Sequence, residues 1–371
     1  MKILEVINAL NSGGAERFVI DLCNQFAADG HQVTLMILKD HAIKNNVFFL
    51  KELSPKVIFI SLGVGKCNIT TFFKVYKAIK SQECDVMHVH LSVAFFASLS
   101  ILFDRRMPYI LTCHNQAENE KREYFRFFVK KYLYKKGLFD YVAISHQNAE
   151  SIKMVYGKAA STIIYNGRDK MIISDNEENV KKEIDAFRTS NETKVFVMIA
   201  RCNQQKNLSR LVRCFNTLKN QGRDVQLLVI GSGYDSPEGQ QLQSEAMPHI
   251  HFLGPKHYVA DYLIHSDFFT LSSDFEGMPI TLIESMACGC IPVGTPVSGF
   301  NDVIRDGING FIATDFTDKA YIDALERAID QKELISKEKL INDYKQHFSV
   351  KVCAHRYEDL FTKKIASHHK S

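Results

Sequence analysis

The residues of this sequence best placed to do chemistry are two glutamates around the start of a helix. Glu276 and Glu284 flank Gly277, Met278 and Pro279 in the segment FEGMPITLIESMACG. Glycine allows a tight loop and proline is favoured in a first helical turn, so Glu276 is expected in a loop and Glu284 on a helix. A helix N-terminus presents free backbone N–H groups and a partial positive charge, which suits a diphosphate beside Gly277 and Met278.

This arrangement predicts a site for a sugar nucleotide. Glu276 would accept hydrogen bonds from sugar hydroxyls, and Glu284, one to two turns deeper, from ribose hydroxyls. Taken alone, the same pattern also fits a solvated loop acid and a helix acid paired with a lysine. Two carboxylates on either side of a glycosidic bond would indicate a hydrolase, but these two share one loop and one helix.

Two basic residues follow an earlier predicted strand. Arg201 comes directly after that strand and Lys206 stands five residues later, just before a predicted helix over residues 208–218. A planar guanidinium and a mobile ammonium can together neutralise a diphosphate leaving group. Each is also compatible with an ordinary surface base.

Three more positions lie where predicted strands end. Gly13 and Gly14 join the first strand to the first helix, Gly231 begins a Gly-Ser-Gly turn, and His114 comes two residues after a strand. Ligands of open α/β sheets bind beyond the carboxyl ends of the strands, so these positions face the expected site. A glycine pair is otherwise often a plain turn and a lone histidine is often structural. The sequence has no G-x-G-x-x-G spacing for a dinucleotide.

Taken together, the motifs resemble those of the retaining glycosyltransferases of family 4. The matching segments run in order along most of the chain: residues 13–16, 165–167, 200–201, 206–207, 231–233, 275–289 and 306–311. The resemblance implies the GT-B architecture, in which two Rossmann-like α/β domains face each other across an interdomain cleft. Ala200 stands where many relatives have glycine.

The resemblance also implies roles for single residues. His114 resembles the family's active-site histidine, which contacts the donor sugar or the acceptor. Arg201 and Lys206 match the pair that neutralises the diphosphate, and Gly231 matches the loop near the nucleotide. The loop of Gly13 and Gly14 corresponds to the one that approaches the transferred sugar and the phosphates.

The mechanism implied by the resemblance retains the anomeric configuration. The departing phosphate oxygen would help to deprotonate the acceptor on the front face, while the protein orients the substrates and stabilises charge. No covalent nucleophile is evident and the D-x-D motif of metal-dependent transferases of the other fold is missing. Since Arg201, Lys206 and a helix N-terminus supply positive charge, we expect no metal and no cofactor. A nucleotide sugar, UDP-linked, would be the donor substrate, and the transferred group a hexosyl or N-acetylhexosaminyl unit.

The order of predicted elements indicates a doubly wound α/β protein with two domains. A length of 371 residues allows two sizeable cores. Apolar runs alternate with amphipathic segments, as in βαβ units. The expected strands are residues 3–7, 32–37, 57–60, 85–89, 109–112, 141–144 and 161–165, and then 194–199, 225–230, 250–253, 268–271 and 291–294. We expect an acceptor-binding domain over residues 1–170, joined by a crossover helix in 350–371, and a donor-binding domain over 171–349.

The composition is that of an ordinary soluble protein, with 46% hydrophobic and 24% charged residues. The nine cysteines show no metal-ligand pairs, which indicates buried thiols in a reducing compartment. The N-terminus does not resemble a secretory signal, and the longest apolar stretch, near residues 93–103, is too short to span a bilayer. We therefore expect a cytoplasmic protein.

One basic segment predicts peripheral contact with a membrane. Residues 1–170 carry 23 lysines and arginines against 15 acidic residues, and bases alternate with aromatics over residues 120–137. Such a helix can lie among anionic headgroups, or can pack on a core with a solvated basic face. The bases expected to contact a membrane or an acceptor are Lys121, Arg122, Arg126, Lys130 and Lys131. No motif of nucleic-acid binding accompanies the charge.

The favoured hypothesis is therefore a glycosyltransferase of polysaccharide biosynthesis, such as capsule or lipopolysaccharide, at the inner face of a bacterial membrane. Its acceptor would be a glycan or a glycan linked to polyprenyl diphosphate. Two alternatives stay open. One is a nucleotide-sugar epimerase of the same architecture, and the other is a noncatalytic subunit of this fold that only binds a transferase or a membrane.

Overall fold

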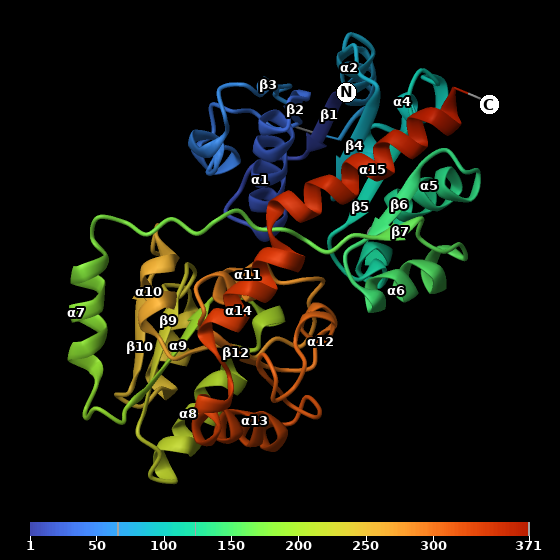
Figure 1. Cartoon of the computed structure of the whole chain (residues 1–371). Coiled ribbons are helices and arrows are strands. Elements are labelled where there is room, and N and C mark those ends of the chain that lie inside the picture. The colour runs from blue at the N-terminus through green and yellow to red at the C-terminus, as the bar shows by residue number, and fades with distance from the viewer. Residues whose placement is uncertain (65–66, 123, 370–371) are drawn as a thin grey trace. The chain divides into compact units, whose positions relative to one another are not determined.

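The computed structural model of the protein describes residues 1–64, 67–122 and 124–369. They form two compact α/β units; in Figure 1 the first is blue to green together with the red C-terminal helix, and the second is green to orange-red. Unit 1 comprises Met1–Asp169 and Phe348–Ser371, and unit 2 comprises Lys170–His347. The chain thus returns to unit 1 at its C-terminus. The assignment of acceptor binding to one unit and donor binding to the other stays a prediction.

Unit 1 is built on a sheet of seven parallel strands in the order β3-β2-β1-β4-β5-β6-β7. The strands are β1 (Lys2–Ile7), β2 (Gln32–Ile37), β3 (Ile58–Ser61), β4 (Val86–His90), β5 (Tyr109–Cys113), β6 (Asp140–Ala143) and β7 (Thr162–Ile163). The helices are α1 (Gly14–Ala28), α2 (Ile69–Lys80), α3 (Val93–Phe96), α4 (Ser98–Phe103), α5 (Tyr124–Lys135), α6 (His146–Tyr156) and α15 (Val350–His368). Short 3-10 turns lie at Lys44–Asn46, Leu50–Glu52 and Ala117–Arg122.

Unit 2 repeats this plan with six parallel strands in the order β10-β9-β8-β11-β12-β13. The strands are β8 (Lys194–Ile199), β9 (Val225–Ile230), β10 (Ile250–Gly254), β11 (Phe268–Leu271), β12 (Ile291–Gly294) and β13 (Phe311–Ile312). The helices are α7 (Glu177–Phe187), α8 (Leu208–Asn220), α9 (Pro237–Glu245), α10 (Val259–His265), α11 (Ile280–Ala287), α12 (Ser298–Val303), α13 (Asp318–Asp330) and α14 (Lys337–Asp343). Unit 2 also contains two 3-10 turns, Gln204–Lys206 and Lys332–Leu334. A π-helical turn, Tyr344–Phe348, lies where the chain passes from unit 2 to unit 1.

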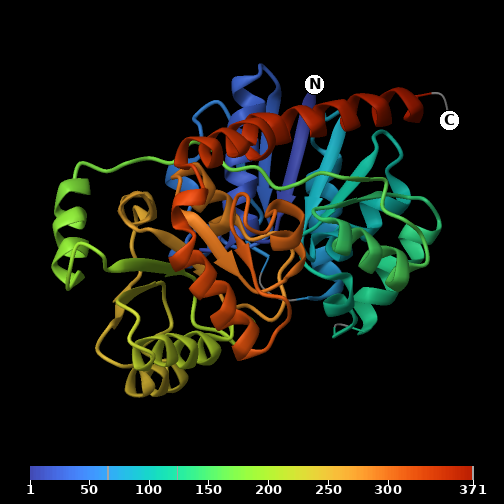
Figure 2. The same ribbon diagram turned by 60° about the horizontal axis from the view of Figure 1, so that its bottom comes forward.

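Helices cover the sheets because parallel strands are apolar on both faces. The core of unit 2 gathers aromatic side chains, with the rings of Phe196 and Phe268 stacked 4.6 Å apart on neighbouring strands. In unit 1, α15 packs beside α1 and runs across the strands, as Figure 2 shows in red. The central strands β1 and β4 of that sheet carry three buried polar residues, Glu5, His88 and His90.

A close contact fixes the return of the chain to unit 1. A Cβ added to Gly167 would lie 2.6 Å from Cys353 Cβ and 2.8 Å from Val350 Cα. The backbone of Arg168 exchanges hydrogen bonds with the start of α15, since its N–H donates to Phe348 O and its carbonyl accepts from Val350 N–H. Only glycine allows this approach, so Gly167 has an architectural role at the point where the chain returns to unit 1.

The predicted strands are confirmed with ends shifted by at most two residues, while the two-residue strand β13 had not been anticipated. Pro279 corrects a detail. It was expected in the first turn of α11, but its ψ of 122° is extended and it lies just before the helix. Gly289, with φ +69°, directly follows Cys288, the C-cap of α11. Within the described part of the chain, no helix combines the length and the apolar character needed to cross a bilayer.

Candidate active site

The expected donor residues lie around the switch point of the second sheet. The strand order reverses at β8, whose neighbours are β9 and β11. The loop after β8 carries Arg201 and Lys206, and the loop after β11 carries Glu276. Because a crevice forms at the carboxyl ends of strands where the order reverses, this edge is the natural ligand site of the unit.

The carboxylate of Glu276 is the centre of a hydrogen-bonded cluster. Lys206 Nζ lies 2.6 Å from Glu276 Oε1, which also accepts from Ser273 Oγ at 2.7 Å. Gln205 Nε2 donates to Oε2 at 2.9 Å. Glu276 is buried and Lys206 is largely so, which protects the ion pair from solvent. A carboxylate has about four acceptor positions, so roughly one on Oε2 stays open for a ligand hydroxyl.

Further bonds join the loops after β8 and β11. The backbone N–H of Asp274 donates to Gln205 O at 3.0 Å, and Ser272 Oγ donates to Lys206 O at 2.8 Å. Arg210, in the first turn of α8, donates to Ser272 O and pairs with Asp274 at 2.8 Å. Asn207 caps α8 in the left-handed region, at φ 43°. These contacts hold Lys206 and Glu276 at a fixed separation before any ligand arrives.

Gly231 lets a third loop approach the same edge. Its φ is +150°, and a Cβ there would lie 1.9 Å from Ala200 O. Tyr234 supports the contact, since its hydroxyl donates to the same carbonyl at 3.1 Å. Arg201 directly follows Ala200 in the sequence, and its side chain is exposed. The guanidinium therefore stands at the edge where a diphosphate would bind, with its fork accessible to a ligand.

The segment before α11 is tightly packed. Gly277, Met278 and Pro279 are buried, and Glu284 is buried one turn into the helix. A Cβ on Gly299, in α12, would lie 2.6 Å from Gly277 O and 2.5 Å from Met278 Cα. The loop that leads into the helix N-terminus is therefore braced from behind by α12.

In unit 1, Gly13 and Gly14 lie at the N-terminus of α1, where Gly13 is the N-cap. A Cβ on Gly13 would meet the flexible carboxylate of Glu16 at 2.3 Å. His114 lies after β5 and lines a cavity of about 270 Å³ together with polar residues that include Asn115 and Arg126. Burial and the neighbouring histidines lower the pKa of His114 well below its ordinary value, so its ring is neutral at pH 7.

Both halves of the chain match family models of sugar transferases. A model described as "Glycosyl transferases group 1" matches residues 179–347. A second, described as "Glycosyltransferase Family 4", matches residues 12–170. The chain belongs to the group 1, family 4 glycosyltransferases. The motif residues of unit 2 lie within the first match, and the glycine loop and His114 lie within the second.

Relatives of this glycosyltransferase cover most of its length. N-acetyl-alpha-D-glucosaminyl L-malate synthase of Bacillus anthracis is 24% identical over 81% of this chain and 80% of that protein. A Campylobacter jejuni alpha-1,4-N-acetyl-D-galactosaminyltransferase, named for a diNAcBac-PP-undecaprenol glycan, is 23% identical over 93% of each chain. Anabaena HepE, solved in complex with UDP and glucose, aligns with a TM-score of 0.80 at 18% identity over 98% of this chain and 100% of its own. The likeness to HepE establishes the GT-B fold.

The basic segment of the glycosyltransferase differs from the expectation. Lys130 does not lie on an exposed basic face, because it is buried and pairs with Glu120 at 2.5 Å. Lys131 donates to Val155 O at 2.9 Å, and the guanidinium of Arg126 lies over the rings of Phe95 and Phe96.

Lys121 is exposed, whereas the side chain of Arg122 lies outside the described part of the structure. The exposed side chains of α5 are largely aromatic: Tyr124, Phe125, Phe128 and Tyr132. The face offered by this helix is thus an aromatic one with bases at its ends.

Three contributors to the site were missed by the sequence analysis. Gln205 and Ser273 hold the carboxylate of Glu276, and Gly299 supports the loop before α11. Gln205 and Ser273 neighbour the predicted residues in sequence, which was the available signal. Gly299 gave no local signal in the sequence. Glycine is required there because a Cβ would overlap the backbone of residues that lie more than twenty positions away in the sequence.

Proposed function

We propose that this glycosyltransferase moves a hexosyl or N-acetylhexosaminyl group from a UDP-sugar to a glycan carried on a polyprenyl diphosphate, with retention of anomeric configuration. The reaction would serve the synthesis of a cell-surface polysaccharide at the inner face of the membrane. The donor site would be the edge of unit 2 that carries Arg201, Lys206 and Glu276, and the acceptor site would lie in unit 1.

The cluster around Glu276 carries the proposal. An ammonium and a carboxylate held 2.6 Å apart at the switch point, with an exposed Arg201 nearby, offer charge for a diphosphate and an acceptor for a sugar hydroxyl. Lys206 keeps two of its three N–H donors for phosphate oxygens, since Glu276 uses one. The likeness to HepE, which was solved with UDP and glucose, supports a uridine nucleotide.

The pairing of Glu276 also supports a transfer step without a covalent intermediate on this carboxylate. A nucleophilic carboxylate needs a free lone pair aimed at the anomeric carbon. Three donors already engage Glu276, and the one acceptor position left on Oε2 is assigned to a sugar hydroxyl, so its proposed role is to hold and orient rather than to attack. The leaving phosphate would then take the proton of the acceptor hydroxyl on the same face. Arg201, Lys206 and the start of α11 would stabilise the departing diphosphate, so we propose that no metal is required.

The surface of α5 supports an acceptor at a membrane. Tyr124 and Phe125 are 73% and 70% exposed, and Tyr132 is 56% exposed. Large amphipathic and apolar rings beside lysines suit the boundary between headgroups and acyl chains. The name of the Campylobacter relative, which includes an undecaprenol-linked diphosphate, agrees with a lipid-borne acceptor.

Nucleotide binding to the whole chain tests the donor site. UDP, GDP and ADP are titrated by isothermal calorimetry against the unmodified protein and against Arg201→Ala. We expect selective binding of UDP that weakens by about tenfold to a hundredfold in Arg201→Ala, the range for a lost hydrogen bond to a charged group. Arg213→Ala is the matched control, because Arg213 is an exposed arginine of α8 that pairs with Asp318.

Product analysis then tests the chemistry. Transfer from UDP-sugars to a polyprenyl-diphosphate glycan is followed by NMR of the anomeric proton, with the metal chelated. An α-linked product from an α-linked donor supports retention, and activity that requires a divalent ion contradicts the metal-free step. Failure of all three nucleotides to bind would favour a noncatalytic protein of this fold.

A further inference from the structure

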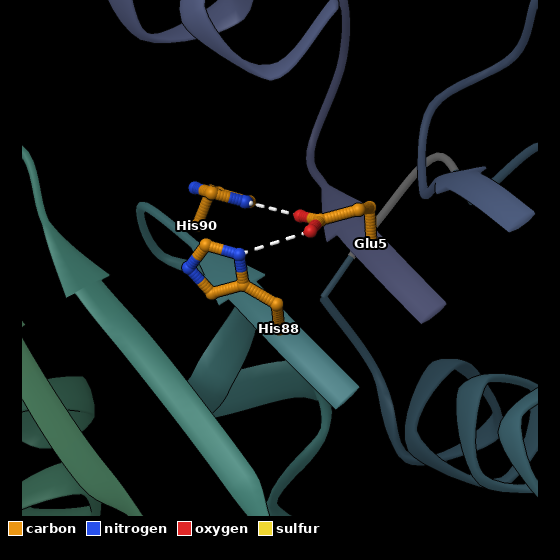
Figure 3. A group of neighbouring side chains, drawn as sticks. All are labelled: Glu5, His88 and His90. Carbon is orange, nitrogen blue, oxygen red and sulfur yellow. Dashed lines mark hydrogen bonds and ion pairs between the residues drawn. The ribbon is translucent and has the colours of Figure 1, made fainter. Parts of the chain in front are cut away.

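A chain of hydrogen bonds crosses the core of unit 1 (Figure 3). Glu5 on β1 and His88 and His90 on β4 are completely buried. Glu5 Oε1 lies 3.0 Å from His88 Nδ1, and Glu5 Oε2 lies 2.7 Å from His90 Nε2. His88 and His90 are two residues apart on one strand, so they share a face of the sheet and both reach the carboxylate from β1. Strands in the centre of a parallel sheet are ordinarily apolar, so this cluster needs an explanation.

The cluster has two branches that leave in different directions. In one, His88 Nε2 lies 2.7 Å from Thr112 Oγ1, which lies 2.7 Å from the hydroxyl of Tyr357 on α15. In the other, His90 Nδ1 lies 2.9 Å from His114 Nε2. The first branch ends in the core, because Tyr357 is completely buried. The second ends at His114, which lines the cavity of about 270 Å³.

The carboxylate sets the direction of every bond in the cluster. An ionised carboxylate only accepts, so His90 must donate to Glu5 from Nε2. His90 is then left with a bare Nδ1, which must accept, and His114 must therefore donate from Nε2. Burial alone would raise the pKa of Glu5, but its interactions with His88 and His90 outweigh burial and lower it to about 2. Burial, and to a lesser extent the neighbouring His88, lower the pKa of His90 to about 4, so the His90 ring is neutral at pH 7.

We propose that Glu5 and His90 are positioning residues that hold His114 as the Nε2–H tautomer, so that its bare Nδ1 serves the cavity as a hydrogen-bond acceptor for a sugar hydroxyl. Since His90 occupies Nε2, Nδ1 is the ring nitrogen left for a ligand. The tautomer follows from the hydrogen bonds together with an ionised Glu5 and a neutral His90, whereas the identity of the ligand rests on the proposed transfer of a sugar. An acceptor at this position selects a ligand that offers an O–H.

The walls of the cavity agree with a ligand site. Leu91 follows His90 directly and lines the cavity with φ 57°, a left-handed conformation that is costly for leucine. Backbone strain of this kind persists where the surrounding structure over-determines it, and it clusters at ligand sites. Glu120 and Asn119 add polar groups to the wall. A hydroxylated ligand would therefore find both donors and acceptors there.

The same three core residues also bring metal-ligating atoms close together. Both carboxylate oxygens of Glu5 already lie at hydrogen-bond distance from an imidazole nitrogen, at 3.0 and 2.7 Å, and each of these histidines has a second partner. The geometry therefore points to protons rather than a cation between these atoms. Zinc retained in stoichiometric amount by the purified protein, with His88 and His90 signals that shift on its removal, would overturn the proposal.

Nitrogen NMR of the whole protein reads the tautomer directly. Histidine labelled with ¹⁵N is incorporated, and a long-range ¹H–¹⁵N correlation separates a protonated ring nitrogen from a bare one. The signals of His114 are assigned by their loss in His114→Gln. At pH 7 we expect Nε2 of His114 to be protonated and Nδ1 to be bare. The opposite tautomer, or a charged ring, overturns the proposal, and this measurement needs no variant of Glu5.

Replacement of the carboxylate by an amide should reverse the branch to the cavity. In Glu5→Gln the amide oxygen can accept while the NH₂ group must donate. Donors and acceptors must therefore exchange roles along one of the two branches. Reversal toward His88 would leave the buried hydroxyl of Tyr357 without an acceptor, whereas reversal toward His90 ends at the cavity. We therefore expect His114 to become Nδ1–H. An unchanged tautomer in the folded variant contradicts the proposal.

A matched variant cuts only the other branch. Tyr357→Phe removes the terminal hydroxyl and keeps the ring in the core, so the tautomer of His114 should not change. A change as large as that in Glu5→Gln would show that packing rather than bond direction governs His114, and would overturn the proposal.

Turnover supplies a separate readout. If His114 accepts from a substrate hydroxyl, Glu5→Gln lowers kcat/KM by about tenfold, as expected for one lost hydrogen bond. An unmodified protein that transfers no sugar would refute the proposed function and leave the tautomer result standing. Normal turnover in Glu5→Gln with a reversed His114 would refute the role in substrate recognition.

Discussion

The ion pair between Lys206 and Glu276 gives the sharpest prediction for the donor site. We consider two substitutions that preserve shape, Lys206→Met and Glu276→Gln, and their combination. The pair joins the loops after β8 and β11 at 2.6 Å, and its side chains are 16% and 8% exposed. At this burial, solvent and salt screen the attraction only in part.

Each single substitution leaves a group without a partner. In Lys206→Met the carboxylate keeps only Ser273 and Gln205 as donors. Removal of one partner of a buried pair costs about 3–5 kcal/mol, and these two remaining donors reduce the expected loss to about 2–4 kcal/mol. In Glu276→Gln the single amide oxygen cannot serve all three donors, which costs about 1–3 kcal/mol.

The double variant separates the pair from its surroundings. With both charges gone, the stability loss should be smaller than the sum of the single losses by about 1–3 kcal/mol. Calorimetric melting measures this well, since 1 kcal/mol shifts the Tm of a 150–250-residue domain by about 2–4 °C. Single losses that add to within about 0.5 kcal/mol would refute the coupling that the structure implies.

A second ion pair of unit 2 provides the control. Lys332 pairs with Asp267 at 2.5 Å, but Asp267 precedes β11 and so lies at the opposite end of the strand from the proposed donor site. Lys332→Met should lower the Tm and leave UDP binding and transfer intact. The two variants of the Lys206 pair should lower the Tm and also remove most transfer. Loss of transfer in Lys332→Met to the same degree would mean that stability, and not the site, accounts for the effect.

Three further predictions concern other parts of the molecule. Gly231→Ala should prevent the approach of β9 to the loop after β8, because its Cβ would overlap a carbonyl oxygen at 1.9 Å, and we expect a lower Tm and weaker UDP binding, measured by calorimetry. Replacement of Phe125 and Tyr132 by serine should reduce sedimentation with anionic vesicles while the Tm and UDP binding stay unchanged, since both side chains are exposed. The unfolding free energy should fall as the pH drops from about 6.5 to about 4, because the pKa of His90 is lowered to about 4 in the folded protein and the unfolded chain therefore binds the proton first. The loss of unfolding free energy approaches about 3 kcal/mol at the lower end of this range. A flat pH profile of the unfolding free energy in urea titrations would contradict this prediction.

The sequence alone determined the layered plan of the protein. Apolar runs of strand length that alternate with amphipathic segments require parallel strands covered by helices, and the strand ends were located to within two residues. Turn and cap residues are local signals, so the placement of Glu276 in a loop and Glu284 on a helix followed from the glycine and proline between them. The loops that carry the candidate site residues were located for the same reason, since they directly follow strands.

Only the tertiary structure decided which of these residues act on one another. Glu276 and Lys206 are seventy positions apart, and their pairing depends on β8 and β11 being neighbours in the sheet. Lys130 reads as a surface base in the sequence, yet Glu120 draws it into the core. The histidine network gave no signal in the sequence, because Glu5 and His90 are eighty-five positions apart and lie on different strands. Sequence periodicity indicates on which face of its own helix or strand a side chain lies. The charge, the burial and the tautomer of a side chain depend instead on the strands that the fold brings beside it.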